Sequence, residues 1–157
     1  MKLLAVVLLL SFVSPAYAQE YLSARFTGKL DERRKFVLAT TAEPYSPRKH
    51  GSIKHFWGGD GAGYEPATVA ASLQLTVDGI QMHLPREALL DLGDPGLPYG
   101  PVLWRDSGQI MVEWHGSDAA GGYTARFIFS GKRLLRREIF RTHSSTPNKP
   151  VDVKEFE

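Results

Sequence analysis

The strongest constraint on the fold is a series of short alternating segments joined by glycine-containing turn pairs. In "TVAASLQLTVDGIQMHL", apolar side chains recur at every second residue from Val69 to Val77, as on one face of a strand. The pair Asp78-Gly79 that follows favours a tight type I′ hairpin, which returns the chain as a second strand. Ser107-Gly108 and Ser130-Gly131 occupy the same place between other alternating segments. The pattern therefore predicts antiparallel sheets built from consecutive strands.

About eight such segments recur at spacings of roughly ten residues, which is typical of sandwiches and barrels. We predict a mainly β protein, a single antiparallel β-sandwich or partly open barrel of about eight strands. One short helix is expected at about residues 85–92, in "PREALLDLG", because Pro85 suits a first turn and Gly93 a C-terminal cap. The lack of βαβ alternation argues against a doubly wound nucleotide-binding sheet.

The N-terminal stretch "MKLLAVVLLLSFVSPAYAQE" has the three parts of a secretory signal peptide. Lys2 supplies the positive start, Leu3 to Val13 the apolar run, and Ala16-Tyr17-Ala18 the small-x-small cleavage site. We expect residues 1–18 to be removed and the product to be periplasmic or secreted, in a bacterial host. The apolar run is too short for a membrane-spanning helix, which needs about 20 residues, so no integral membrane segment is expected after cleavage.

The remaining chain is expected to form a single β-rich domain over residues 19–142, with a long loop over 42–67 and a flexible C-terminal tail over 143–157. The chain has no cysteine, so stability must come from core packing rather than from disulfides. Its formal net charge of +2 is too small to indicate nucleic acid as a partner.

Basic residues cluster in "ERRK" (32–35) and in "KRLLRRE" (132–138). If the first and last strands pair, the two clusters form one positive patch suited to weak contact with acidic envelope surfaces. The simpler interpretation is that these charges guard strand edges against aggregation.

The long loop contains "HFWGGDGAGYEP", whose glycines resemble a phosphate or calcium loop at first sight. A P-loop needs a lysine and a hydroxyl residue directly after its last glycine, and here Tyr64, Glu65 and Pro66 follow. Calcium needs six or more oxygen ligands, and the stretch offers only the carboxylates of Asp60 and Glu65. Both interpretations are therefore rejected.

The aromatic residues of this loop are the candidate binding residues. Exposed aromatic rings can stack on sugars or anchor a partner protein, and the predicted binding set is Tyr45, Phe56, Trp57, Asp60 and Tyr64. The leading prediction is accordingly a non-catalytic module that binds a protein or a carbohydrate through residues 45–64, without a cofactor. In the competing interpretation, Trp57 folds down and plugs the end of the sandwich.

The alternative function is a metal-binding protein or metal-dependent hydrolase that uses His50, His55 and Asp60. Two imidazoles and a carboxylate suit a transition metal such as zinc. Their spacing of five and five fits neither a helix nor a strand, so solvated loop histidines are the simpler interpretation. The neighbours His115, Ser117 and Asp118 have the composition of a catalytic triad, but "HGSDAAGG" is better explained as a hairpin loop, and no catalytic residue is predicted.

Overall fold

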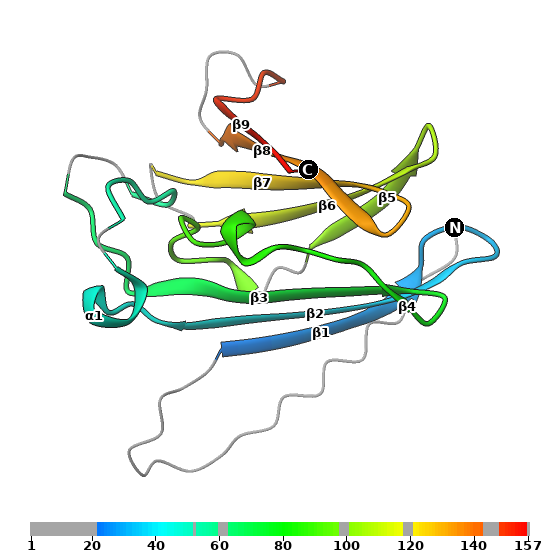
Figure 1. The fold of residues 1–157 in the computed structure, drawn as a ribbon, viewed down its shortest axis with the longest axis horizontal. Coiled ribbons are helices and arrows are strands. Elements are labelled where there is room, and N and C mark those ends of the chain that lie inside the picture. The colour runs from blue at the N-terminus through cyan, green and yellow to red at the C-terminus, as the bar shows by residue number, and fades with distance from the viewer. Residues whose placement is uncertain are drawn as a thin grey trace, which may run out of the picture.

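The computed structural model describes residues 22–51, 53–59, 63–97, 101–117, 121–142 and 148–156. In this part of the chain two antiparallel sheets pack against each other (Figure 1). They do not close into a barrel, and the predicted antiparallel sandwich is confirmed. The predicted signal peptide lies outside the described residues, so its cleavage stays a prediction.

Each sheet is built from strands that follow one another along the chain. The first sheet has the order β1 (Leu22–Lys29), β2 (Lys35–Pro44), β3 (Thr68–Val77) and β4 (Ile80–Gln81). The second has the order β5 (Val102–Asp106), β6 (Gln109–Gly116), β7 (Tyr123–Ser130), β8 (Arg133–Arg141) and β9 (Asp152–Glu155). All neighbouring pairs are antiparallel.

Two hairpin turns have the backbone that their sequences predict. Asp78 and Gly79 have φ angles of 50° and 78°, and Ser107 and Gly108 have φ angles of 48° and 85°. Positive φ at both central residues is the mark of a type I′ turn, whose twist matches that of the flanking strands. The local turn chemistry therefore sets the register of these hairpins.

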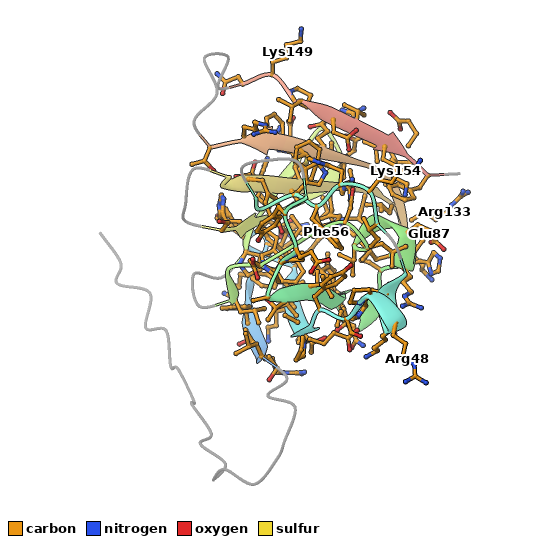
Figure 2. The ribbon with its side chains drawn as sticks, turned by 90° about the vertical axis from the view of Figure 1, so that its left-hand side faces the viewer. Arg48, Phe56, Glu87, Arg133, Lys149 and Lys154 are labelled. Carbon is orange, nitrogen blue, oxygen red and sulfur yellow. The ribbon has the colours of Figure 1, made fainter. Side chains whose placement is uncertain are left out.

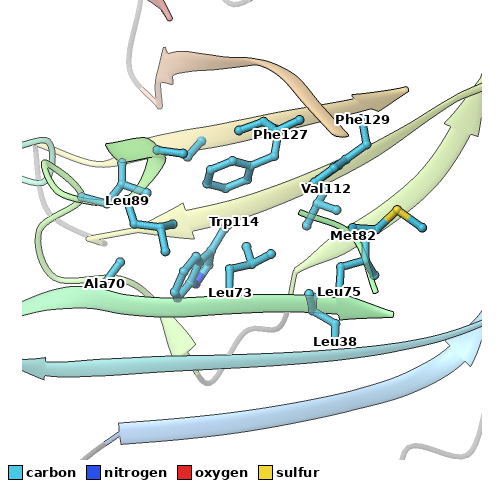
Figure 3. Packing of buried hydrophobic residues seen from close by; sticks show 14 of the residues in the cluster. Leu38, Ala70, Leu73, Leu75, Met82, Leu89, Val112, Trp114, Phe127 and Phe129 are labelled. Atoms are coloured by element: carbon cyan, nitrogen blue, oxygen red, sulfur yellow. The ribbon is translucent and has the colours of Figure 1, made fainter. Parts of the chain in front are cut away.

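The core lies between the sheets and is built from the alternate residues of each strand (Figure 3). Leu38 of β2 and Leu75 of β3 share the core with Val112 and Trp114 of the second sheet, and these four side chains are at most 2% exposed. The alternation follows from the two-residue period of a strand, which places every second side chain on one face. Burial of these apolar side chains supplies the main stabilising term.

The helical segments differ from the expectation. The segment predicted as a helix over about 85–92 is a single 3-10 turn, η1 (Arg86–Ala88), and the α-helix α1 (Pro47–His50) lies in the long loop instead. The Leu92 amide still bonds locally to Leu89, but the Leu92 carbonyl accepts from the Ala70 amide of β3, so the backbone pairs with another segment where the helix was expected to end. No helix among the described residues is long and apolar enough to cross a bilayer.

The C-terminal segment also differs from the prediction of a flexible tail. Residues Asp152–Glu155 form β9, which pairs with β8 and extends the second sheet.

The two basic clusters do not meet through strand pairing, because β1 pairs with β2 whereas β8 pairs with β7 and β9. The predicted long loop starts later than expected, because β2 continues to Pro44.

A buried arginine holds the tail and the η1 turn together. Arg137 of β8 is 1% exposed and donates to the carbonyl oxygen of Ala88 at 3.1 Å. It pairs with Asp91 through two nitrogens and with Asp152 of β9 at 3.1 Å. Burial alone would lower the pKa of this guanidinium, but the two carboxylates raise it above its ordinary value. One side chain therefore links the turn, β8 and β9.

Leucine-to-alanine changes test where the core lies. Leu92→Ala should lower the free energy of unfolding by about 2–5 kcal/mol, because Leu92 is 1% exposed and its loss leaves a cavity. Leu22→Ala, at a side chain that is 46% exposed, should change it by no more than about 0.5 kcal/mol. Urea unfolding of both variants checks this, and equal effects would contradict the packing described.

Candidate functional site

One extended connector organises the end of the sandwich that carries the loops. Residues 91–97 run between the sheets and bond to three other segments. Two backbone hydrogen bonds join the connector to the long loop: the Trp57 amide donates to the Asp91 carbonyl at 2.8 Å, and the Gly93 amide donates to the Trp57 carbonyl at 2.9 Å. Another joins it to the start of β3, where the Asp94 amide donates to the Thr68 carbonyl at 2.9 Å.

The connector bonds equally to the second sheet. The Gly96 amide donates to the carbonyl of His115, at the end of β6, at 2.8 Å. The Ser117 amide donates to the Asp94 carbonyl at 2.9 Å. The connector therefore joins the long loop and both sheets at one place, although it contains no regular strand.

Asp94 is the polar centre of this arrangement. Its carboxylate accepts hydrogen bonds from the Tyr64 hydroxyl, from the Thr68 amide at 2.9 Å and from the Thr68 hydroxyl at 3.2 Å. Asp94 and Ser117 have φ angles of 43° and 53°, in the left-handed region that non-glycine residues rarely adopt. Neither lies in a two-residue hairpin turn. Strained residues of this kind cluster at binding and active sites.

A hollow of about 600 Å³ opens beside these two residues. We call it the loop-end hollow, and its lining residues are Asp94, Gly96, His115, Gly116, Ser117, Tyr123 and Thr142. The side chains offer imidazole, hydroxyl and carboxylate groups, and they come from the connector, β6, β7 and the end of β8. Small-molecule sites in proteins usually have volumes of about 300–1,000 Å³, so the hollow is of a suitable size.

Two tyrosines beside the hollow are held in their neutral form. Burial and the hydrogen bond to Asp94 raise the pKa of Tyr64 above its ordinary value. Burial, followed by the negative charges of Asp91 and Asp94, raises the pKa of Tyr123. The Tyr123 hydroxyl donates to the Gly93 carbonyl at 3.0 Å, so both phenols brace the connector as hydrogen-bond donors.

The glycine-rich loop serves close backbone packing at this end. Gly58 has a φ of 114°, and a Cβ atom there would lie 2.7 Å from the Gly93 carbonyl oxygen. A Cβ atom on Gly121, which precedes β7, would lie 2.8 Å from the Gly58 carbonyl oxygen. Real Cβ atoms do not come this close, so glycine is required where the loop, the connector and the β6–β7 loop meet.

The described aromatic residues of the predicted binding set turn toward the protein. Phe56 is 4% exposed and meets the Tyr45 ring edge-on at 5.0 Å, and Figure 2 shows it near the middle of this end of the molecule. Trp57 is partly buried against the core, and its ring lies 5.8 Å from the Arg141 guanidinium. Tyr64 is bound to Asp94. Asp60 lies outside the described residues. This placement agrees with the interpretation in which Trp57 plugs the sandwich.

The two described histidines of the predicted metal site, His50 and His55, contact different residues. The Nε2 atom of His50 lies 2.8 Å from Glu43, and its Nδ1 atom lies 3.0 Å from the backbone of Ser46. His55 instead meets the Trp57 ring at 4.7 Å. Burial pushes the pKa of Glu43 upward, but hydrogen bonds from Lys49 and His50 hold it below its ordinary value. Within the described ranges, no three histidine, aspartate or glutamate side chains form a group that could hold a metal.

His115 and Ser117 both line the loop-end hollow. The sequence analysis names these two residues only as members of a catalytic triad that it rejects. The Nδ1 atom of His115 is 2.8 Å from the Thr124 hydroxyl, and this is the contact that orients the ring among the described residues. Asp118 lies outside the described residues. Asp94 and Thr142 were not predicted as site residues, because no local motif marks them.

No protein-family model, curated protein or solved structure matches this chain. The function is therefore argued from the geometry of the loop end.

The titration of Tyr64 gives a test of the Asp94 cluster. Because the pKa of Tyr64 is raised on folding, the folded protein keeps the phenol proton when the unfolded chain loses it. The associated stability is complete below the unfolded pKa of about 10 and is lost as the pH rises through the folded pKa. In Tyr64→Phe, the free energy of unfolding should therefore fall less steeply than in the wild type above about pH 10.

Urea unfolding at a series of alkaline pH values measures this slope. Tyr45→Phe is the matched control, because the Tyr45 hydroxyl has no hydrogen bond to a described residue, and it should keep the wild-type slope. A wild-type slope in Tyr64→Phe would contradict the hydrogen bond to Asp94.

Proposed function

We propose that this protein is an exported, non-catalytic binding module whose ligand occupies the loop-end hollow. The observation that carries the proposal is the strained pair Asp94 and Ser117 beside a hollow lined with hydrogen-bonding side chains. Asp94 lies outside the β-hairpins, and Ser117 lies in the longer loop between β6 and β7 rather than in a two-residue turn. Strained residues of this kind are frequent at ligand sites. The N-terminal signal pattern supports export.

The chemistry of the lining favours a neutral, hydroxyl-rich ligand such as a carbohydrate. The imidazole of His115 and the hydroxyl group of Thr142 can donate hydrogen bonds to sugar hydroxyls or accept them. The Asp94 carboxylate is already bound by Tyr64 and Thr68, so its role is to hold the connector. An anionic ligand would meet the negative charge of the Asp94 carboxylate, which lines the hollow.

In this proposal, the aromatic side chains of the long loop do not contact the ligand. Phe56 and Trp57 secure the long loop to the core, and the loop in turn supports the connector that frames the hollow. The proposed binding surface therefore differs from the predicted one. It consists of the polar side chains that line the loop-end hollow, and not of the aromatic side chains at residues 45–64.

A sugar titration followed by backbone amide chemical shifts tests the proposal. Glucose, N-acetylglucosamine and a maltooligosaccharide, each at about 10 mM, would reveal dissociation constants in the millimolar range. At least one should shift the amides of residues 93–97, 115–117 and 121–123. His115→Ala should weaken this response by about tenfold, as expected for the loss of one or two hydrogen bonds in a site.

His83→Ala is the matched control. His83 is also exposed, and it lines a separate hollow of about 300 Å³ with Glu87, Arg133 and Lys154. Figure 2 shows these last three residues at one side of the molecule. This variant should keep the wild-type response. Shifts that cluster away from the loop-end hollow, or a response unchanged in His115→Ala, would contradict the proposal.

A further inference from the structure

A second interaction surface lies at the edge of the first sheet, away from the loop-end hollow. Within the described residues, strands β1, β4, β5 and β9 each have one side without a partner strand, and β1 is the longest of them with eight residues. At the opposite edge of the first sheet, β4 has only two residues, and the chain after it forms a single bridge from His83 to Arg133 of β8. The free edge of β1 is therefore a long, regular row of backbone donors and acceptors.

The two faces of β1 differ in chemistry. Ala24 and Phe26 are partly buried and pack against the core, whereas Leu22 on the same face is 46% exposed. Arg25 and Lys29 are exposed on the other face. An added strand would continue the sheet and cover the apolar face with its own alternate side chains.

The charges on this edge are unbalanced. Arg25, Lys29 and Lys35 are exposed, and none of their side chains forms an ion pair with a described residue. Lys29 also stands directly opposite Lys35 in the β1–β2 register. Like charges in directly opposed positions destabilise a sheet, so an acidic group placed beside this pair would relieve an electrostatic penalty.

We propose that β1 is a docking edge for an acidic extended segment of a partner protein, which pairs with it as an additional strand. Acidic side chains at alternate positions of that segment would meet Arg25, Lys29 and Lys35, and apolar side chains between them would cover Leu22 and Phe26. The same charges disfavour a second copy of this chain, because two antiparallel copies of β1 would place their arginines and lysines on one face.

Two short, end-blocked peptides provide the probes, one alternating valine with glutamate and the other alternating valine with lysine. The glutamate peptide should bind at least about tenfold more tightly at low ionic strength, a difference of about 1.4 kcal/mol, as expected for two or three exposed ion pairs. It should slow hydrogen exchange at backbone amides within residues 22–29. The difference should shrink at 1 M salt, where the Debye length is about 3 Å.

The double variant Arg25→Glu/Lys29→Glu should reverse the preference toward the lysine peptide. Both side chains are exposed, and the new glutamate at 29 would face Lys35, so the variant should fold. Arg48→Glu/Lys54→Glu makes the same change of charge at exposed positions elsewhere, and it should keep the wild-type preference.

Several outcomes would overturn the proposal. These are equal affinity for the two peptides, no binding of either at about 1 mM, and slowed exchange outside residues 22–29. A concentration-dependent mass that disappears in the double variant would show that β1 pairs with a second copy. Binding to anionic phosphatidylglycerol vesicles without slowed exchange in β1 would show a membrane contact instead.

Discussion

The loop end of this protein depends on one extended connector that hydrogen-bonds to both sheets. Residues 91–97 take backbone partners from the long loop, from the start of β3 and from the end of β6. Leu92 fills the core below them, and Arg137 binds Asp91 at the head of the connector. Without this segment, the two sheets would lose these shared hydrogen bonds, and the loop-end hollow would lose the wall that Asp94 and Gly96 form.

This constraint explains why strain and close packing collect in the same place. The connector has to turn between two sheets within a few residues, and Asp94 has a positive φ there. The same turn brings the Gly93 carbonyl against Gly58 and Tyr123. The Asp94 carboxylate stabilises the turn by accepting bonds from Tyr64 and Thr68. A buried or strained polar group of this kind is stable only when its hydrogen bonds are satisfied.

The sequence was informative where structure is decided locally. The Asp78-Gly79 and Ser107-Gly108 pairs predicted their turns because positive φ is a property of two adjacent residues. The sequence analysis placed the first two residues of the connector at the end of the expected helix and predicted no element for the rest, because the partners of the connector lie about twenty to forty residues away and leave no local pattern. The contact between Tyr64 and Asp94 was unpredictable for the same reason. β9 was missed because a four-residue edge strand with exposed Val153 has little apolar period.

Native-state hydrogen exchange of the connector and its partners tests this account most directly. The amides of Trp57, Gly93, Asp94, Gly96 and Ser117 are each bonded across segments, so they should exchange as slowly as the central amides of β3 and β6. That result would show one cooperative unit that includes the loop end. Fast exchange of these five amides, while β3 and β6 remain protected, would contradict the role assigned to the connector.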